Sequence, residues 1–184
     1  MDIKSLKLEG TYLITLDPRR DQRGFLMRAF DSKIFEENSL PYTWVQENQS
    51  NSLQKGIIRG LHFQFPPFTE SKMVRVVSGS ILDVFVDLRK NSLTYGQSDS
   101  VILSAENNQA VVIAKGLAHG FCTLTDNVIM IYHHDNFYSK EHENGVLWND
   151  KNLAIDWPII NPILSDRDRN FQTFKEFDEK YHGL

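Results

Sequence analysis

Apolar and polar residues alternate along the middle of the chain, and this period of two constrains the fold more than any other feature. Over residues 81–88, every even-numbered position is leucine or valine, and the odd-numbered positions include two aspartates. Alternate side chains of a β-strand point to opposite faces of its sheet. Residues 57–65, 111–114 and 128–132 show a similar pattern, and short segments rich in Gly, Asn and Ser separate them. The chain is therefore predicted to be mainly β, an antiparallel sandwich or barrel.

Helices are expected to be few and short. Residues 31–38 predict one helix, with Asp31 as its N-cap. Near the end of the chain, Phe171, Phe174, Phe177 and Tyr181 recur at helical spacing. They predict an amphipathic helix that packs on the barrel or on a partner.

Length and composition are those of an ordinary soluble protein. The 184 residues predict one domain, residues 1–184, and the contents of 41% hydrophobic and 24% charged residues are typical of a globular chain. A net charge of −4 argues against a nucleic-acid partner, although local arginines can still bind an anionic small molecule. The one cysteine, Cys122, is predicted to be a buried structural thiol. The sequence shows no signal peptide or membrane-spanning segment, which predicts a cytoplasmic protein without a membrane partner.

Three residues in the centre of the chain carry groups suited to acid–base chemistry. The segment RGLHFQ contains Arg59 and His62, and Lys72 opens the next apolar segment. We expect these segments to be two neighbouring strands. Apolar residues flank His62, so the histidine points to the other face of its strand. A regular strand would direct Arg59 away from His62, but a turn at Gly60 would let both side chains reach one pocket.

This set suits the removal of a proton beside a carbonyl group of a phosphate-bearing substrate. The histidine takes the proton, the lysine holds the enolate oxygen, and the arginine holds phosphate. Each residue also has an ordinary structural alternative: His62 as a core histidine and Lys72 as a surface lysine at a strand end. A lysine that opens an apolar strand is costly to bury without a purpose, which favours the functional interpretation.

A metal site and a hydrolytic site agree less well with the sequence. Metal-binding β-barrels often use a His-x-His pair, whereas here Gln64 follows His62 and Glu70 is poorly placed as a further ligand. His133 and His134 are adjacent, so a strand would point them to opposite faces. No Gly-x-Ser-x-Gly segment is present, and the single cysteine has no evident activating partner. We therefore expect neither a bound metal nor a hydrolase.

Ten sequence blocks, spread along nearly the whole chain, resemble those of a known enzyme family. They are DQRGF from Asp21, QENQS from Gln46, RGLHFQ from Arg59, KMVR from Lys72, DVFVDLR from Asp83, SAEN from Ser104, GLAHGF from Gly116, WND from Trp148, IDWP from Ile155 and LSDRD from Leu164. The chain is similar in these blocks to the dTDP-4-dehydrorhamnose 3,5-epimerases. These enzymes invert carbons beside the keto group of a nucleotide-linked 4-keto-6-deoxyhexose.

The resemblance implies a fold, a partner and a pathway. The fold is a double-stranded β-helix, or jelly roll (cupin-like). The protein would be a homodimer that uses no metal or organic cofactor and binds a nucleotide-diphosphate 4-keto-deoxysugar. It would act in deoxysugar synthesis for a surface polysaccharide, as in the rhamnose pathway and lipopolysaccharide O-antigen.

The resemblance also implies roles for individual residues. His62 matches the base that removes the proton, Asp168 the carboxylate that hydrogen-bonds this base, and Lys72 the residue near the keto oxygen. Tyr132 matches the general acid on the opposite face of the sugar, with a buried structural tyrosine as the alternative. The implied substrate contacts are Gln46, Asn48, Arg59, His119, Glu143 and Arg167, with Arg23, Arg28 and Tyr138 near the nucleotide, partly from the neighbouring subunit.

Two positions depart from the family pattern. Arg28 stands where the family usually has glutamate, and Glu70 stands where it often has glutamine. An arginine can meet the acceptor atoms of cytosine, so Arg28 raises a CDP-linked 4-keto sugar as an alternative substrate. It could instead pair with Glu70 or a phosphate and leave thymidine binding unchanged. Inversion of a single carbon and a sugar-binding jelly roll without catalysis are further alternatives.

The segment from Asp21 to Phe30 bears on assembly. Residues 25–30 alternate like a strand. If such a strand were unpaired, its free backbone N–H and C=O groups could pair with another chain. Together with the resemblance, this pattern predicts a homodimer in which residues 21–30 contribute to the site of the partner.

Overall fold

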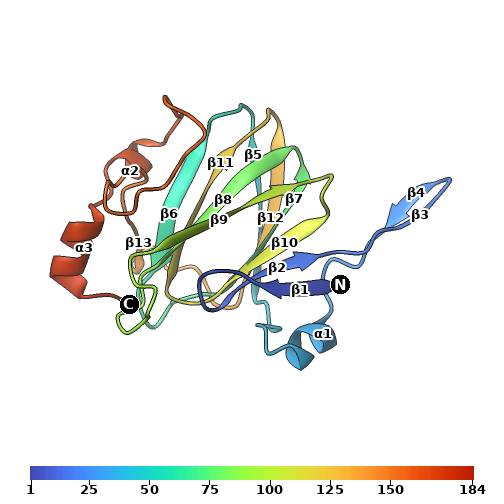
Figure 1. Ribbon diagram of the computed structural model, residues 1–184, viewed down its shortest axis with the longest axis horizontal. Coiled ribbons are helices and arrows are strands. Elements are labelled where there is room, and N and C mark those ends of the chain that lie inside the picture. The colour runs from blue at the N-terminus through green and yellow to red at the C-terminus, as the bar shows by residue number, and fades with distance from the viewer.

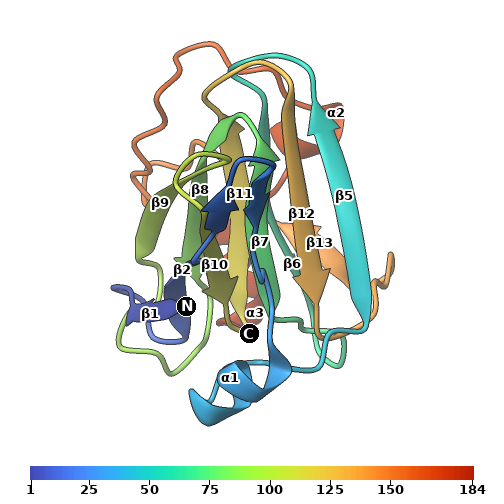
Figure 2. The ribbon, with the colours of Figure 1, turned by 90° about the vertical axis from the view of Figure 1, so that its right-hand side faces the viewer.

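The computed structural model describes residues 1–184 and shows two antiparallel β-sheets that face each other, with three short helices outside them (Figures 1 and 2). The six-stranded sheet has the order β1-β2-β10-β7-β12-β5, formed by Asp2–Ser5, Thr11–Thr15, Gln109–Ile113, Lys72–Ser78, Val128–His134 and Gln46–Ser52. The five-stranded sheet has the order β13-β6-β11-β8-β9, formed by Glu143–Gly145, Ile58–Gln64, Leu117–Thr123, Ser80–Asp87 and Ser98–Ser104. The expected mainly β jelly roll is confirmed.

The strands that carry His62 and Lys72 belong to different sheets. β6 pairs with β11 and β13, whereas β7 pairs with β10 and β12. The prediction that His62 and Lys72 lie on neighbouring strands is therefore wrong, because the chain crosses from one sheet to the other between them. The two side chains consequently reach the interior from opposite walls.

The main core fills part of the space between the sheets. The four segments predicted as strands in the middle of the chain are strands, because the opposite sheet buries one of their faces. Twelve buried apolar residues form this core: Leu8, Val74, Val76, Ile81, Phe85, Leu103, Val111, Ile113, Leu117, Phe121, Val128 and Met130. Inward positions nearer one end of the same strands carry polar side chains instead, and the cavity described below lies there.

Two further clusters cover the outer faces of the sheets. α3 (Phe174–Tyr181) packs on the five-stranded sheet through Phe177, which joins Leu61 and Phe63 in one buried cluster. α1 (Ser32–Glu37) packs on the six-stranded sheet through Phe35, against residues such as Met73. Figure 1 shows α3 and α1 at opposite sides of the two sheets. Both faces of β6 and β7 are thereby held in place.

The predicted helices are present, with one change of boundary. Asp31 caps α1, since its carboxylate accepts hydrogen bonds from the backbone N–H groups of Lys33 and Ile34. The C-terminal helix begins at Phe174 rather than at Phe171, because Thr173 forms a capping box with Glu176. A further short helix, α2 (Asp166–Arg169), was not anticipated. None of the three helices has the length and apolar character needed to span a bilayer.

A small hairpin reaches away from the barrel (Figure 1). It consists of β3 (Arg19–Asp21) and β4 (Gly24–Leu26), so the strand expected over residues 25–30 ends earlier than predicted. After β4 the chain turns back to the body, where the Phe30 ring packs edge-on against Phe35, with ring centroids 4.9 Å apart. This tertiary contact replaces the extended conformation that the alternation suggested.

A buried carboxylate anchors the loop after β8. Both oxygens of Asp87 accept hydrogen bonds: from the Arg89 guanidinium at 2.7 and 2.9 Å, and from the hydroxyls of Ser92 and Thr94 at 2.6 Å each. Burial by itself raises the pKa of Asp87, but these donors outweigh it and lower the pKa to about 2, from an ordinary value of 3.8. The ionised form is thus stabilised by folding.

We predict that Asp87→Asn lowers the free energy of unfolding at pH 7 by about 2 kcal/mol, the equivalent of the pKa shift at 1.36 kcal/mol per unit. Because the folded-state pKa is the lower one, this stabilisation is fully present above the unfolded-state pKa and is lost as the pH falls toward about 2. Urea unfolding of parent and variant between pH 7 and pH 2 measures the difference. Asp156→Asn, at an exposed carboxylate without a hydrogen bond, is the control. A difference that grows on acidification would contradict the assignment.

Candidate active site

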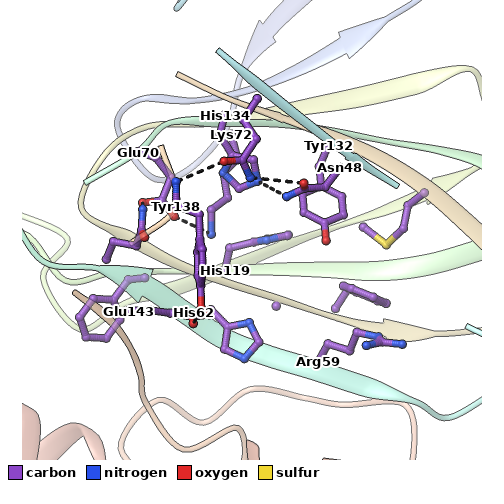
Figure 3. A pocket seen from close by; sticks show the side chains of 16 residues that line it. Asn48, Arg59, His62, Glu70, Lys72, His119, Tyr132, His134, Tyr138 and Glu143 are labelled. Carbon is purple, nitrogen blue, oxygen red and sulfur yellow. Dashed lines mark hydrogen bonds and ion pairs between the residues drawn. The ribbon is translucent and has the colours of Figure 1, made fainter. Parts of the chain in front are cut away.

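A cavity of about 520 Å³ lies between the two sheets (Figure 3). Its lining is mostly polar, with side chains from both walls: Gln46, Asn48, Arg59, His62, Phe63, Gln64, Glu70, Lys72, His119, Gly120, Phe121, Met130, Tyr132, His134, Tyr138 and Glu143. The alternation of each strand directs these polar groups inward, since they continue the rows of residues that form the core. Most of the residues predicted for a site are brought together here.

A β-bulge in β6 brings Arg59 and His62 to the same cavity. His62 is opposite His119 on β11, and Arg59 is opposite Phe121, so three steps along β6 match two along β11. The extra residue reverses the alternation of β6 between the two positions. Gly60 occupies the bulge with a φ of 125°, a conformation that other residues rarely adopt. The predicted effect of a turn at Gly60 is confirmed.

His62 is held by a carboxylate from outside the sheet. Its Nε2 lies 2.6 Å from Oδ1 of Asp168, which belongs to α2, and the ring also contacts the edge of Phe171. Burial acts to raise the pKa of Asp168, but the hydrogen bond from His62 and further donors leave it below its ordinary value. Asp168 therefore accepts the Nε2 proton of His62. The other ring nitrogen, Nδ1, is left free to accept a proton from a molecule in the cavity.

Lys72 is buried and paired. Its ammonium lies 3.3 Å from Oε1 of Glu70, and the side chains of both residues are less than a tenth exposed. The other Glu70 oxygen accepts a hydrogen bond of 2.8 Å from Gln64. A lysine ammonium that contacts a carboxylate can still offer a hydrogen to an anionic oxygen. The alternative of a surface lysine is thus excluded.

Tyr132 lies across the cavity from His62, on β12 of the six-stranded sheet. Burial raises the pKa of its hydroxyl, and the nearby charge of Arg59 only partly opposes this. The phenol therefore stays protonated at neutral pH. A base on one wall faces a proton donor on the other, with Lys72 on the same wall as the donor.

A second histidine–aspartate pair was not anticipated in full. His119 was predicted to contact substrate, and its Nε2 lies 2.9 Å from Oδ2 of Asp83, which is completely buried. Asp83 is an inward-facing residue of β8, opposite β11. The sequence signal for it was present, because a carboxylate on the inward row of an otherwise apolar strand requires a partner.

Three predicted residues form a polar group at the edge of the cavity. The Tyr138 hydroxyl donates to Oε2 of Glu143 at 2.7 Å, and the Arg167 guanidinium lies 2.8 Å from the same oxygen. Burial alone raises the pKa of Glu143, but these two donors lower it overall. Arg167 comes from α2, next to Asp168, so this helix supports both groups.

Four predicted residues do not line the cavity of this chain. Asp168 and Arg167 pair with lining residues, whereas Arg23 and Arg28 do not. Arg23, in the projecting hairpin, pairs with Asp21 at 2.6 Å and has a side chain that is 84% exposed. Arg28 pairs with Asp31 at 2.7 Å. The suggested ion pair between Arg28 and Glu70 is therefore wrong, since each has another partner. Within one protomer, Arg28 does not line the cavity, so nothing there supports a contact between Arg28 and a cytosine base.

The two adjacent histidines of β12 do point to opposite faces. His133 lies outside, with Nε2 2.7 Å from Glu47, whereas His134 lines the cavity and was not predicted as a site residue. No group of three or more His, Cys, Asp or Glu side chains is arranged to hold a metal ion. Cys122 is buried, and burial raises the pKa of its thiol to about 11, as a structural role requires.

Comparison with known proteins identifies a family. Residues 5–176 match the family model described as dTDP-4-dehydrorhamnose 3,5-epimerase. A protein of that name from Shigella flexneri is 46% identical over 94% of this chain and 97% of its own. The structure of dTDP-6-deoxy-D-glucose-3,5-epimerase from Legionella pneumophila, in complex with dTDP-4-keto-L-rhamnose, has a TM-score of 0.92 and 36% identity, covering 97% of this chain and 95% of that one.

A relative with a narrower activity is also similar. The structure of a 3′-monoepimerase from Streptomyces bikiniensis, in complex with dTDP-quinovose, has a TM-score of 0.89 and 33% identity, covering 95% of this chain and 88% of that one. Sequence, fold and cavity agree, and the chain belongs to the dTDP-4-dehydrorhamnose 3,5-epimerase family.

Proposed function

We propose that this protein is a cofactor-independent epimerase that inverts C3 and C5 of a dTDP-linked 4-keto-6-deoxyhexose, within one domain of residues 1–184. The reaction supplies deoxysugars for surface polysaccharides. The observation that carries the proposal is a histidine base and a protonated tyrosine on opposite walls of one cavity, beside a buried ammonium group. We place the enzyme in the cytoplasm, where free thiols such as Cys122 are usual.

The reaction begins when Nδ1 of His62 removes the proton from a carbon beside the keto group. Asp168 holds Nε2 of the same ring, so it fixes the tautomer and stabilises the imidazolium that forms. This pairing orients the base without the need for any bound ion. The electrons of the broken C–H bond pass into the carbonyl group, which becomes an enolate.

Lys72 stabilises the negative oxygen of this enolate. A carbon acid beside a ketone is much weaker than imidazolium, so the enzyme must stabilise the enolate strongly, at about 1.36 kcal/mol for each tenfold gain in rate. A fixed donor in a water-poor site supplies several kcal/mol of that stabilisation. The contact with Glu70 keeps the ammonium at the cavity wall.

Tyr132 completes the inversion by protonating the same carbon from the other face. Its hydroxyl keeps its proton because burial raises its pKa, and it approaches from the sheet opposite His62. Return of a proton from His62 would restore the original configuration. Stereochemical inversion thus depends on two groups on two walls.

The remaining polar residues bind and orient the substrate. Arg59 meets the diphosphate as a bidentate cation. Gln46, Asn48, His119, Glu143 and Arg167 hold the sugar, and Tyr138 closes the cavity toward the nucleotide, with Arg23 and Arg28 supplied by the neighbouring subunit. A thymidine nucleotide is favoured over cytidine, because the structural relatives described above bind dTDP sugars and Arg28 lies away from the cavity of its own chain.

Deuterium incorporation tests this function directly. We expect the parent to exchange protons of dTDP-4-keto-6-deoxyglucose with heavy water and to epimerise it, with lower kcat/KM for the CDP-linked sugar. His62→Asn should abolish exchange and epimerisation together, because one base starts both. Asp168→Asn should remain folded but lose about 100-fold or more in rate, as for other bases deprived of their orienting anion. Mass spectrometry and NMR of the product measure exchange and epimerisation. Turnover near that of the parent in either variant would refute the base assignment.

Tyr132→Phe should separate exchange from inversion. His62 can still remove the proton and return a solvent deuteron to the same face, whereas delivery from the other face is lost. NMR of the product in heavy water should therefore show deuterium without the new configuration. The assignment of Tyr132 fails if the variant epimerises as fast as the parent.

The hairpin supports assembly into a homodimer. Phe25 and Leu26, on its second strand β4, are 55% and 76% exposed, and the exposed side chain of Arg23 in the turn pairs only with Asp21. A projecting hairpin with exposed apolar side chains and an exposed arginine is suited to insertion beside the cavity of a second copy, where the arginine would meet the nucleotide.

Complementation between two variants tests the shared site. His62→Asn and Arg23→Glu should each be nearly inactive alone. In a hybrid dimer, one site combines an intact His62 from one subunit with an intact Arg23 from the other. Random mixing should therefore restore about a quarter of parental activity, if dimers assemble with two-fold symmetry. Absence of recovery in hybrids purified by two different tags, or a fully active monomer by light scattering, would rule out the shared site.

A further inference from the structure

A chain of hydrogen bonds along the cavity wall has a defined direction. It starts at the backbone N–H of Tyr138, which can only donate, and which lies 3.2 Å from Oε1 of Gln46. The Gln46 amide nitrogen then donates to Oδ1 of Asn48 at 3.3 Å. The remaining amide nitrogen of Asn48 lies 3.4 Å from Nε2 of His134. Because each amide has one acceptor and one donor end, the first bond fixes the orientation of both amides.

This direction determines the tautomer of His134. The amide nitrogen of Asn48 has no lone pair to offer, so Nε2 of His134 must be the acceptor. Burial lowers the pKa of His134 to about 3, and the neighbouring charges of Lys72, His119 and His133 act in the same sense. The ring is therefore neutral at working pH, and its single proton lies on Nδ1.

The Nδ1–H group is an unused donor in the cavity. No protein atom accepts a hydrogen bond from it, and it is not sealed from solvent as Nδ1 of the outward-facing His133 is. His134 lies on the cavity wall directly opposite Lys72 in the pairing of β12 with β7, and its ring meets Tyr132 edge-on at 5.4 Å. Figure 3 shows His134 beside Lys72, at the side of the cavity across from His62.

We propose that His134 donates its Nδ1–H to the developing enolate oxygen and acts with Lys72 as a two-donor oxyanion site. The inference rests on the proposed function, because it needs an enolate. Facing residues on adjacent antiparallel strands have side chains about 5 Å apart at their base, so both donors can reach one oxygen.

The ion pair of Lys72 with Glu70 explains why a second donor, His134, would be needed. The Glu70 carboxylate lies 3.3 Å from the ammonium and offsets part of its charge. A neutral N–H donor has no such counter-ion and is already oriented by Asn48, so it stabilises the enolate without reorganisation. A neutral histidine is also a weak acid, and it keeps its proton while it donates the hydrogen bond.

Two amide substitutions at His134 distinguish the role of Nδ1 from that of Nε2. The amide of His134→Asn reaches the place of Nδ1 and can still donate to the enolate. The longer amide of His134→Gln reaches the place of Nε2, where it keeps the contact with Asn48 but leaves no donor at Nδ1. We expect kcat to fall about 100-fold in His134→Gln with KM little changed, and to fall much less in His134→Asn. Deuterium exchange should fall in parallel with kcat, because both require the enolate.

Nitrogen NMR of histidine-labelled protein tests the tautomer independently of activity. We expect a protonated Nδ1 and an unprotonated Nε2 for His134. The signals of this ring are assigned by their absence from the spectrum of His134→Gln. A protonated Nε2 would overturn the proposal. If the parent is active and His134→Gln is equally active, the role of His134 is refuted but the proposed function stands. If the parent shows no deuterium exchange, the proposed function is refuted, and the role of His134 with it.

Discussion

One extra residue in β6 determines which side chains the cavity contains. At Gly60 the strand bulges, so that Arg59 and His62, three positions apart, share one face. The bulge requires two glycines in contact. A Cβ on Gly60 would lie 2.5 Å from the Cα of Gly120, and a Cβ on Gly120 would lie 2.7 Å from the carbonyl oxygen of Arg59. Without this close approach of β6 and β11, the side chains of Arg59 and His62 would lie on opposite sides of the sheet.

Three basic groups of the cavity are each held by a carboxylate. His62 with Asp168, His119 with Asp83, and Lys72 with Glu70 each combine a basic group with a buried carboxylate. An unpaired charge in such a place would cost several kcal/mol, and a paired one is also fixed in direction. The cavity of about 520 Å³ lies between the two walls, so the proposed base and acid would act on opposite faces of a sugar ring bound there.

The local sequence was sufficient to predict features that depend on a single strand or helix. The alternation of residues 81–88 and the inward position of His62 follow from the period of a strand, and the start of α1 follows from its N-cap. The sequence could not show that β6 and β7 lie in different sheets, because pairing depends on partners far along the chain. The link of Asp83 to His119 was missed for the same reason, since it requires the register of β8 with β11. The hairpin strand was predicted too long because the packing of Phe30 on Phe35 is a tertiary contact.

The two histidines at the end of β12 show how position alone separates chemical roles. They are neighbours in sequence, yet the period of the strand places His133 outside, against Glu47 and the Trp44 ring, and His134 inside, near three other basic groups. Outside, His133 pairs with a carboxylate. Inside, burial and positive neighbours disfavour the charged form of His134, and the amide of Asn48 then selects the nitrogen that keeps the proton. The backbone of residue 138 ultimately fixes this choice, so the identity of a donor in the cavity depends on a main-chain N–H three hydrogen bonds away.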